Sequence, residues 1–117
     1  MTYRITIPDF RFTPLNQLGW HWGKRSRLKK QDRDFVWAYS LLLGIPQATT
    51  KRRVSLEITI TGRQQETDPD ALWKSCLDAL VKNSRLMDDS AKWCELGTVT
   101  YTRGEKTETV IVLEDIG

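Results

Sequence analysis

A strict alternation of apolar and polar residues between positions 54 and 61 is the feature that most limits how this chain can fold. Valine, leucine and isoleucine occupy the even positions, while serine, glutamate and threonine occupy the odd ones. Successive side chains of a β-strand point to opposite faces of its sheet, so the pattern predicts a strand with one buried face. Gly62 follows the last polar residue and ends this strand.

Three other segments predict strands that can share a sheet with this one. Residues 3–7 alternate in the same way and are followed by Pro8, which suits the end of a strand. A second alternation covers residues 98–102, and residues 110–113 form a short apolar run. The intervening Arg103-Gly104-Glu105 is typical of a hairpin turn, so we expect the last two strands to pair directly.

Two segments have the spacing of amphipathic helices. Apolar residues recur at helical intervals from about residue 27 to residue 43, where Gly44 and Pro46 are stop signals. The second helix is expected over residues 68–82, because Asp-Pro-Asp at its start combines a favoured cap with a favoured first helical residue. Residues 8–23 contain prolines, glycines and scattered aromatics, which indicate a long loop.

The length of 117 residues suits one domain, and 39% hydrophobic residues exclude a disordered chain. The order of elements predicts a mixed α/β (α+β) domain over residues 1–117, with a single mixed sheet of about four strands and two main helices packed against it. No apolar run reaches the roughly 18–20 residues that cross a bilayer, and no signal peptide is visible. We therefore expect a cytoplasmic protein without a membrane partner. Cys76 and Cys94 lack zinc-site spacing and are expected to be reduced thiols.

Basic residues gather at the start of the first expected helix. The net charge is only +3, yet six of the ten residues from 24 to 33 are basic. The members are Lys24, Arg25, Arg27, Lys29, Lys30 and Arg33, with Asp32 the one acidic residue among them. Cations are disfavoured at a helix N-terminus, so phosphate binding would account for the cluster; a solvated helix face is the alternative. Trp20 and Trp22 could stack on bases or anchor the loop, and His21 between them is a weak candidate acid or base.

Acidic residues gather separately, around the second expected helix. Asp68 and Asp70 stand at its start, while Asp70, Lys74 and Asp78 follow at intervals of four and share one helix edge. Asp88-Asp89 follows the helix after a short turn. Carboxylates converging beside a lysine suit Mg²⁺-assisted phosphodiester cleavage. The alternative is structural: an N-cap, a solvated charge ladder and an ordinary turn.

Residues 68–89, DPDALWKSCLDALVKNSRLMDD, resemble the signature of the RusA family of Holliday junction resolvases, in which D-x-D-N precedes K-x-x-x-D-A-L and a D-D pair. The first strand ending in proline, a loop with Asn16, the basic stretch and the two closing strands are similar more loosely. The matching positions are Asp68, Asp70, Lys74, Asp78-Ala79-Leu80 and Asp88-Asp89. Ala71 departs from the pattern, because the family has asparagine there.

The resemblance implies a Mg²⁺-dependent endonuclease, with Mn²⁺ also possible and no organic cofactor, which acts as a homodimer. Its expected partner is a four-way DNA junction, resolved by paired symmetric nicks in DNA recombination and repair. By position, Asp68, Asp70 and Asp89 would bind metal, Asp88 is a secondary candidate, and Lys74 is the essential lysine. Lys24, Arg25, Arg27, Lys29 and Lys30 are the candidate DNA-binding residues.

Three other functions remain open at this point. Ala71 leaves room for a non-catalytic module of the same fold that binds branched DNA selectively. A nuclease for flaps or other branched DNA would have the same site. A small structural protein would carry all these charges on its surface and would bind no DNA.

Overall fold

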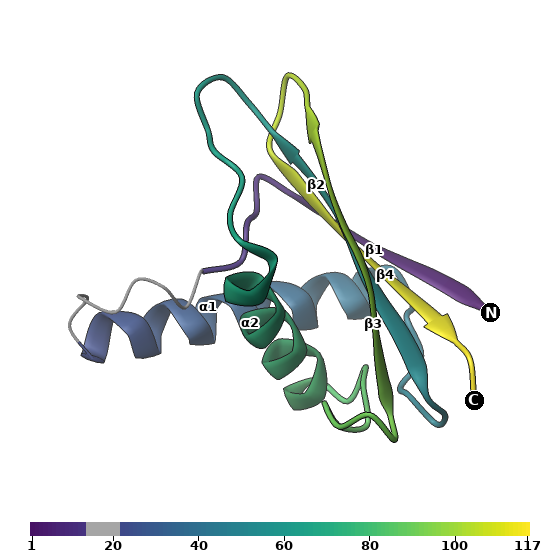
Figure 1. Ribbon diagram of the computed structural model, residues 1–117. Coiled ribbons are helices and arrows are strands. Elements are labelled where there is room, and N and C mark those ends of the chain that lie inside the picture. Colours follow the sequence, from purple (N-terminus) through teal and green to yellow (C-terminus); the bar gives the residue numbers. More distant parts are fainter. Residues whose placement is uncertain (14–21) are drawn as a thin grey trace.

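The computed structural model describes residues 1–13 and 22–117, with the side chains of residues 22–25 outside the description. It contains a single four-stranded mixed sheet and two helices, as the sequence predicts (Figure 1). The elements are β1 (Thr2–Pro8), α1 (Trp22–Leu42), β2 (Arg52–Ile60), α2 (Pro69–Lys82), β3 (Cys94–Arg103) and β4 (Glu108–Asp115).

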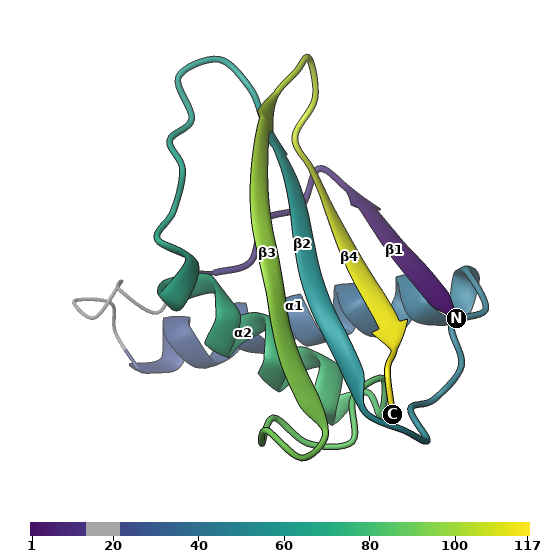
Figure 2. The same ribbon diagram turned by 45° about the vertical axis from the view of Figure 1, so that its right-hand side comes forward.

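The strand order is β1-β4-β2-β3, so the last strand of the chain lies inside the sheet (Figure 2). β4 pairs antiparallel with both β1 and β2, whereas β2 and β3 pair in parallel and are joined through α2. The expected hairpin between β3 and β4 is therefore wrong, because β2 separates them. The apolar run of β4 suits this interior position, where Ile111 and Leu113 have no exposed surface.

Both helices lie against the same face of the sheet (Figure 2). The predicted alternation of β2 is confirmed: Val54, Leu56, Ile58 and Ile60 are buried. α2 contributes a buried stripe to the same core, namely Leu72, Ser75, Cys76, Ala79 and Leu80. Burial of this apolar surface against the sheet is the main stabilising contribution for a domain of this size.

α1 begins at Trp22, about five residues before the expected start. The whole basic cluster therefore belongs to this helix. The longer helix is explained by the high helix propensity of lysine and arginine, which acts even without acidic residues in the first turn. Its end is confirmed: Gly44 adopts φ +66°, and the N–H of Ile45 donates to the carbonyl of Ser40 at 2.9 Å. The expected roles of Asn16, Trp20 and His21 fall outside the described residues.

The two cysteines are buried free thiols, as expected. Burial raises the pKa of the Cys76 thiol far above its ordinary value, and it also raises that of Cys94. Neither residue is therefore a nucleophile at neutral pH. None of the described helices is both long and apolar enough to span a membrane.

Candidate active site

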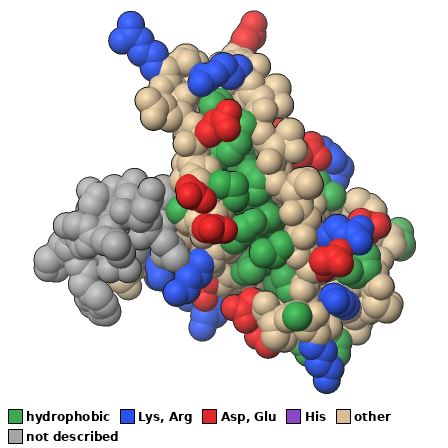
Figure 3. Space-filling view, in the orientation of Figure 1, with side chains coloured by type: hydrophobic (Ala, Val, Ile, Leu, Met, Phe, Trp, Pro, Cys, Tyr) green, Lys and Arg blue, Asp and Glu red, His purple; other side chains and the backbone are tan. Residues whose placement is uncertain are grey.

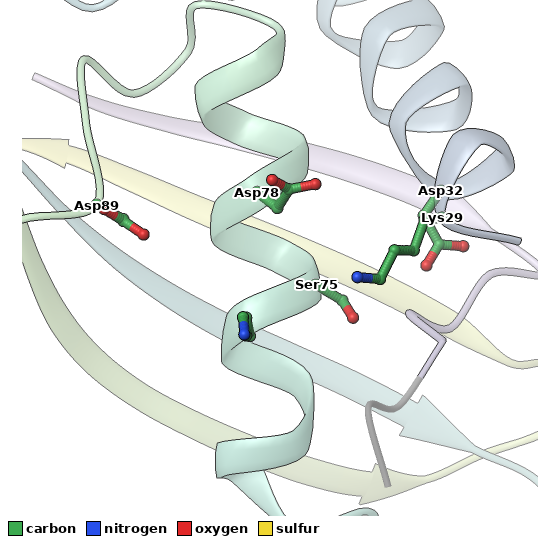
Figure 4. Close-up of a pocket in the computed structure, with 6 residues that line it drawn as sticks. Lys29, Asp32, Ser75, Asp78 and Asp89 are labelled. Carbon is green, nitrogen blue, oxygen red and sulfur yellow. The ribbon is translucent and has the colours of Figure 1, made fainter. Parts of the chain in front are cut away.

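A pocket of about 100 Å³ lies between α1 and α2, and we call it the α1–α2 pocket (Figure 4). Its volume is several times that required by one water molecule. Its lining is almost entirely charged and comes from both helices and from the connection after α2. The lining residues are Lys29, Asp32, Lys74, Ser75, Asp78 and Asp89.

The start of α2 is held firmly in place beside this pocket. The hydroxyl of Tyr101 on β3 accepts a hydrogen bond from the N–H of Thr67 and donates one to its carbonyl, both at 2.9 Å. Arg11 also donates to the hydroxyl of Thr67 at 3.0 Å. Asp68 then caps the helix, because its carboxylate accepts from the N–H of Asp70 at 3.0 Å. The capping interpretation of Asp68 is therefore confirmed, and its metal-binding role stays a prediction.

The structure brings some of the sequence-predicted site residues together and leaves others apart. Lys74 and Asp89 both line the α1–α2 pocket, as does Lys29 from the expected DNA-binding set. Three predicted acidic residues are exposed and do not line it: Asp68, Asp70 and Asp88. Arg27 and Lys30 are exposed on α1, while the side chains of Lys24 and Arg25 are outside the description.

Acidic and basic side chains lie close together on the face of the molecule that carries α2, next to a band of hydrophobic side chains (Figure 3). Lys74 and Asp78 lie one helical turn apart on α2. The ion pairs found among the described residues, at up to 4.0 Å, do not join Lys74 to Asp70 or to Asp78. The charges of α2 therefore do not neutralise one another as a closed ladder, and they stay available to a ligand.

Three lining residues were missed by the site predictions: Asp32, Ser75 and Asp78. Asp32 and Ser75 both hold Thr13, the last described residue before α1. The carboxylate of Asp32 accepts from the N–H of Thr13 at 2.8 Å and from its hydroxyl at 3.4 Å, and the hydroxyl of Ser75 donates to its carbonyl at 2.6 Å. Thr13 thus joins α1 to α2 at the pocket. Two signals were present in the sequence: Asp32 is an acidic residue inside a basic cluster, and Asp78 shares a helix edge with Lys74.

Burial raises the pKa of the Asp32 carboxyl above its ordinary value of 3.8, although the hydrogen bonds from Thr13 act in the opposite direction. The folded state therefore holds this proton more tightly than the unfolded state does. Its contribution to stability is fully present below pH 3.8 and is lost as the pH rises through the native pKa.

We expect Asp32→Asn to remove this dependence, because an amide does not titrate. The measurement is the free energy of unfolding in urea from pH 3 to pH 7 for both proteins. As the pH rises through the window above 3.8, the wild-type protein should lose stability relative to the variant. Two curves that stay parallel over the whole range would contradict the prediction.

The donor atoms of the pocket fit a hard cation that is completed by substrate. Mg²⁺ is commonly held by only one or two carboxylates, with water and substrate phosphates supplying the other oxygens. Asp78 and Asp89 meet that requirement as exposed carboxylates of one pocket. Within residues 1–13 and 26–117, no three His, Cys, Asp or Glu side chains are gathered closely enough to hold a metal ion alone.

Comparison with known proteins adds no further assignment. No family model matches the chain, and no curated protein matches it.

Proposed function

We propose that this protein is a metal-dependent endodeoxyribonuclease that cuts branched DNA, with the four-way junction as its substrate. The observation that carries the proposal is the convergence of Lys74 with Asp78 and Asp89 in one solvent-open pocket. Two carboxylates and a lysine in one pocket are the groups that phosphodiester hydrolysis needs. The resemblance of residues 68–89 to the RusA signature points in the same direction.

Hydrolysis of a phosphodiester adds one water molecule across one P–O bond. The hydroxyl of the water joins phosphorus, and its remaining proton goes to the sugar oxygen that leaves. Negative charge builds up on the phosphate oxygens during this step, and the ammonium group of Lys74 can stabilise it. A carboxylate of the pocket can accept a hydrogen bond from the attacking water and orient it.

A bound Mg²⁺ would lower the pKa of water and stabilise the leaving oxygen. Asp89 is the carboxylate common to the sequence-based set and to the pocket, so we assign it to the metal. The second carboxylate comes from α2: Asp78 lines the pocket, whereas Asp70 lies one turn before Lys74 on the same helix edge, with Asp68 beside it. Comparing the cleavage rates of Asp70→Asn and Asp78→Asn distinguishes a metal site made by Asp89 with Asp78 from one made by Asp89 with Asp70.

The partner follows from the charge distribution. α1 carries the basic cluster next to the acidic pocket, and its exposed members Arg27 and Lys30 suit binding of the phosphate backbone without reading its sequence. A four-way junction has two-fold symmetry, so a homodimer would place two pockets on equivalent strands. DNA recombination and repair are the processes that produce such junctions.

Cleavage of a labelled synthetic four-way junction tests the proposal directly. We expect paired nicks in Mg²⁺ or Mn²⁺, none in EDTA, and none on a linear duplex of the same sequence. Cutting of flaps but not of junctions would show that the substrate is another kind of branched DNA. Absence of cutting on every DNA tested, in either metal, would overturn the nuclease proposal.

A non-catalytic DNA-binding module is the second candidate. The absence of a preformed group of three metal-binding side chains in the described part of the chain favours it, as does Ala71 in place of the family asparagine. This candidate predicts salt-dependent junction binding that is unchanged by Mg²⁺ or EDTA. Nicks that require Mg²⁺ would exclude it.

A further inference from the structure

Lys29 differs from the other described basic residues of α1 in where its side chain lies. It is half-buried and lines the α1–α2 pocket, whereas its neighbour Lys30 is exposed and does not. Figure 4 shows Lys29 extending from α1 toward α2, with its amino group in the space that Ser75 and Asp78 border. A side chain that only bound DNA from the helix surface would not need this inward position.

The amino group of Lys29 is free of any carboxylate partner within 4.0 Å, since no ion pair among the described residues includes it. The residues outside the description contain no aspartate or glutamate that could supply one. Asp32, one turn away on the same helix, directs its carboxylate to Thr13 instead. Two cations, Lys29 and Lys74, therefore reach one pocket from two helices without being neutralised by a close contact.

We propose that Lys29 is a second phosphate-binding cation of the α1–α2 pocket. Together with Lys74, it contacts the phosphate group whose P–O bond is hydrolysed. This assignment rests on the proposed nuclease function and extends it to a residue on the other helix. The charge balance favours a second lysine. Three carboxylates line the pocket, so before a metal ion binds, its formal charge is −1 with both lysines and would be −2 without Lys29. A phosphodiester would then be repelled more strongly.

The hydrogen bonds of Thr13 with Asp32 and Ser75 fix the face of α1 that carries Lys29. Asp32 and Ser75 bind opposite ends of the same residue, so α1 cannot turn about its axis without breaking hydrogen bonds of 2.8 Å and 2.6 Å. Lys29 lies three residues before Asp32 and therefore on the same face of α1. A helix fixed in this way keeps the ammonium group of Lys29 at the pocket, where it can stabilise developing charge.

The test separates binding from chemistry by comparing Lys29→Gln with Lys30→Gln. The affinity for a four-way junction is measured in EDTA, and the cleavage rate is measured in Mg²⁺ under single turnover at saturating protein. Lys29→Gln should lower the saturated rate by about 30-fold or more while changing Kd less than about threefold. The effect of Lys30→Gln should fall on Kd and on its salt dependence. Lys29→Arg should recover part of the rate, and Lys82→Gln on the far end of α2 is the control for both readouts.

A second readout keeps this inference separate from the nuclease proposal. The amino groups are acylated with a small reagent, with and without millimolar inorganic phosphate, and labelling is mapped by mass spectrometry. Phosphate should protect Lys29 and Lys74 but not Lys30, even if the wild-type protein cuts no DNA. The inference is overturned if phosphate protects neither lysine, or if Lys29→Gln and Lys30→Gln alter Kd and rate alike.

Discussion

Asp89→Asn should reduce the rate of junction cutting by about 100-fold or more while leaving junction binding intact. The substitution keeps the shape of the side chain but removes the charge that we assign to the metal ion. Asp89 is exposed, so its replacement should not affect folding. Loss of one negative charge next to bound DNA should keep the affinity equal to that of the wild type or slightly raise it.

The matched control for this experiment is Asp34→Asn, which makes the same charge change at an exposed position of α1 outside the pocket. Its cutting rate should stay within about twofold of wild type. Asp88→Asn should lose less activity than Asp89→Asn, because Asp88 does not line the pocket. Single-turnover cleavage and junction binding are measured for all three variants. Equal losses in Asp88→Asn and Asp89→Asn, or full activity of Asp89→Asn, would show that the site is placed wrongly.

The largest effect on stability is expected from Arg52→Met, at about 3 kcal/mol of unfolding free energy. Arg52 is 2% exposed, and its guanidinium binds Asp115 at 2.8 Å. It also donates to the carbonyls of Pro46 and Arg85, at 3.2 Å and 2.9 Å, and lies 5.1 Å from the ring centre of Tyr3. Methionine fills similar space, but it leaves the buried carbonyl of Arg85 and the partly buried carbonyl of Pro46 without this donor. Each such loss costs roughly 1–3 kcal/mol.

Arg53→Met is the matched control, one residue along the same strand. Arg53 points to the other face of the sheet, is 41% exposed, and forms its ion pairs with Glu95 and Glu114 near solvent. Exposed pairs of this kind contribute little, so Arg53→Met should lose much less stability than Arg52→Met. Urea unfolding of both variants gives the comparison, and equal losses would contradict the buried role of Arg52.

Arg52 also links stability to the proposed site. Its bond to the carbonyl of Arg85 holds the connection between α2 and β3, and that connection carries Asp89 into the pocket. We therefore expect Arg52→Met to slow cutting at temperatures where it is still folded, whereas Arg53→Met should not.

Local sequence patterns predicted the parts of this fold that depend on local physical chemistry. The alternation in β2 predicted its buried face, because a two-residue period has only one arrangement against a core. Gly44 predicted the end of α1, because glycine adopts a left-handed backbone easily. Asp68 predicted the start of α2, because its carboxylate can cap a helix. Lys74 and Asp89 were singled out from the acidic cluster and given their roles by the resemblance, and they do share a pocket.

The order of the strands and the membership of the pocket were decided only by the tertiary structure. Strand pairing depends on contacts between segments far apart in the chain, so a turn-like Arg103-Gly104-Glu105 predicted a β3–β4 hairpin while β2 took the place between them. In the same way, Lys29 and Asp32 reach the pocket only because α1 packs on α2, some forty residues further along the chain. A helical pattern tells which residues share a face, and the packing of that face against a distant partner tells what those residues can do together.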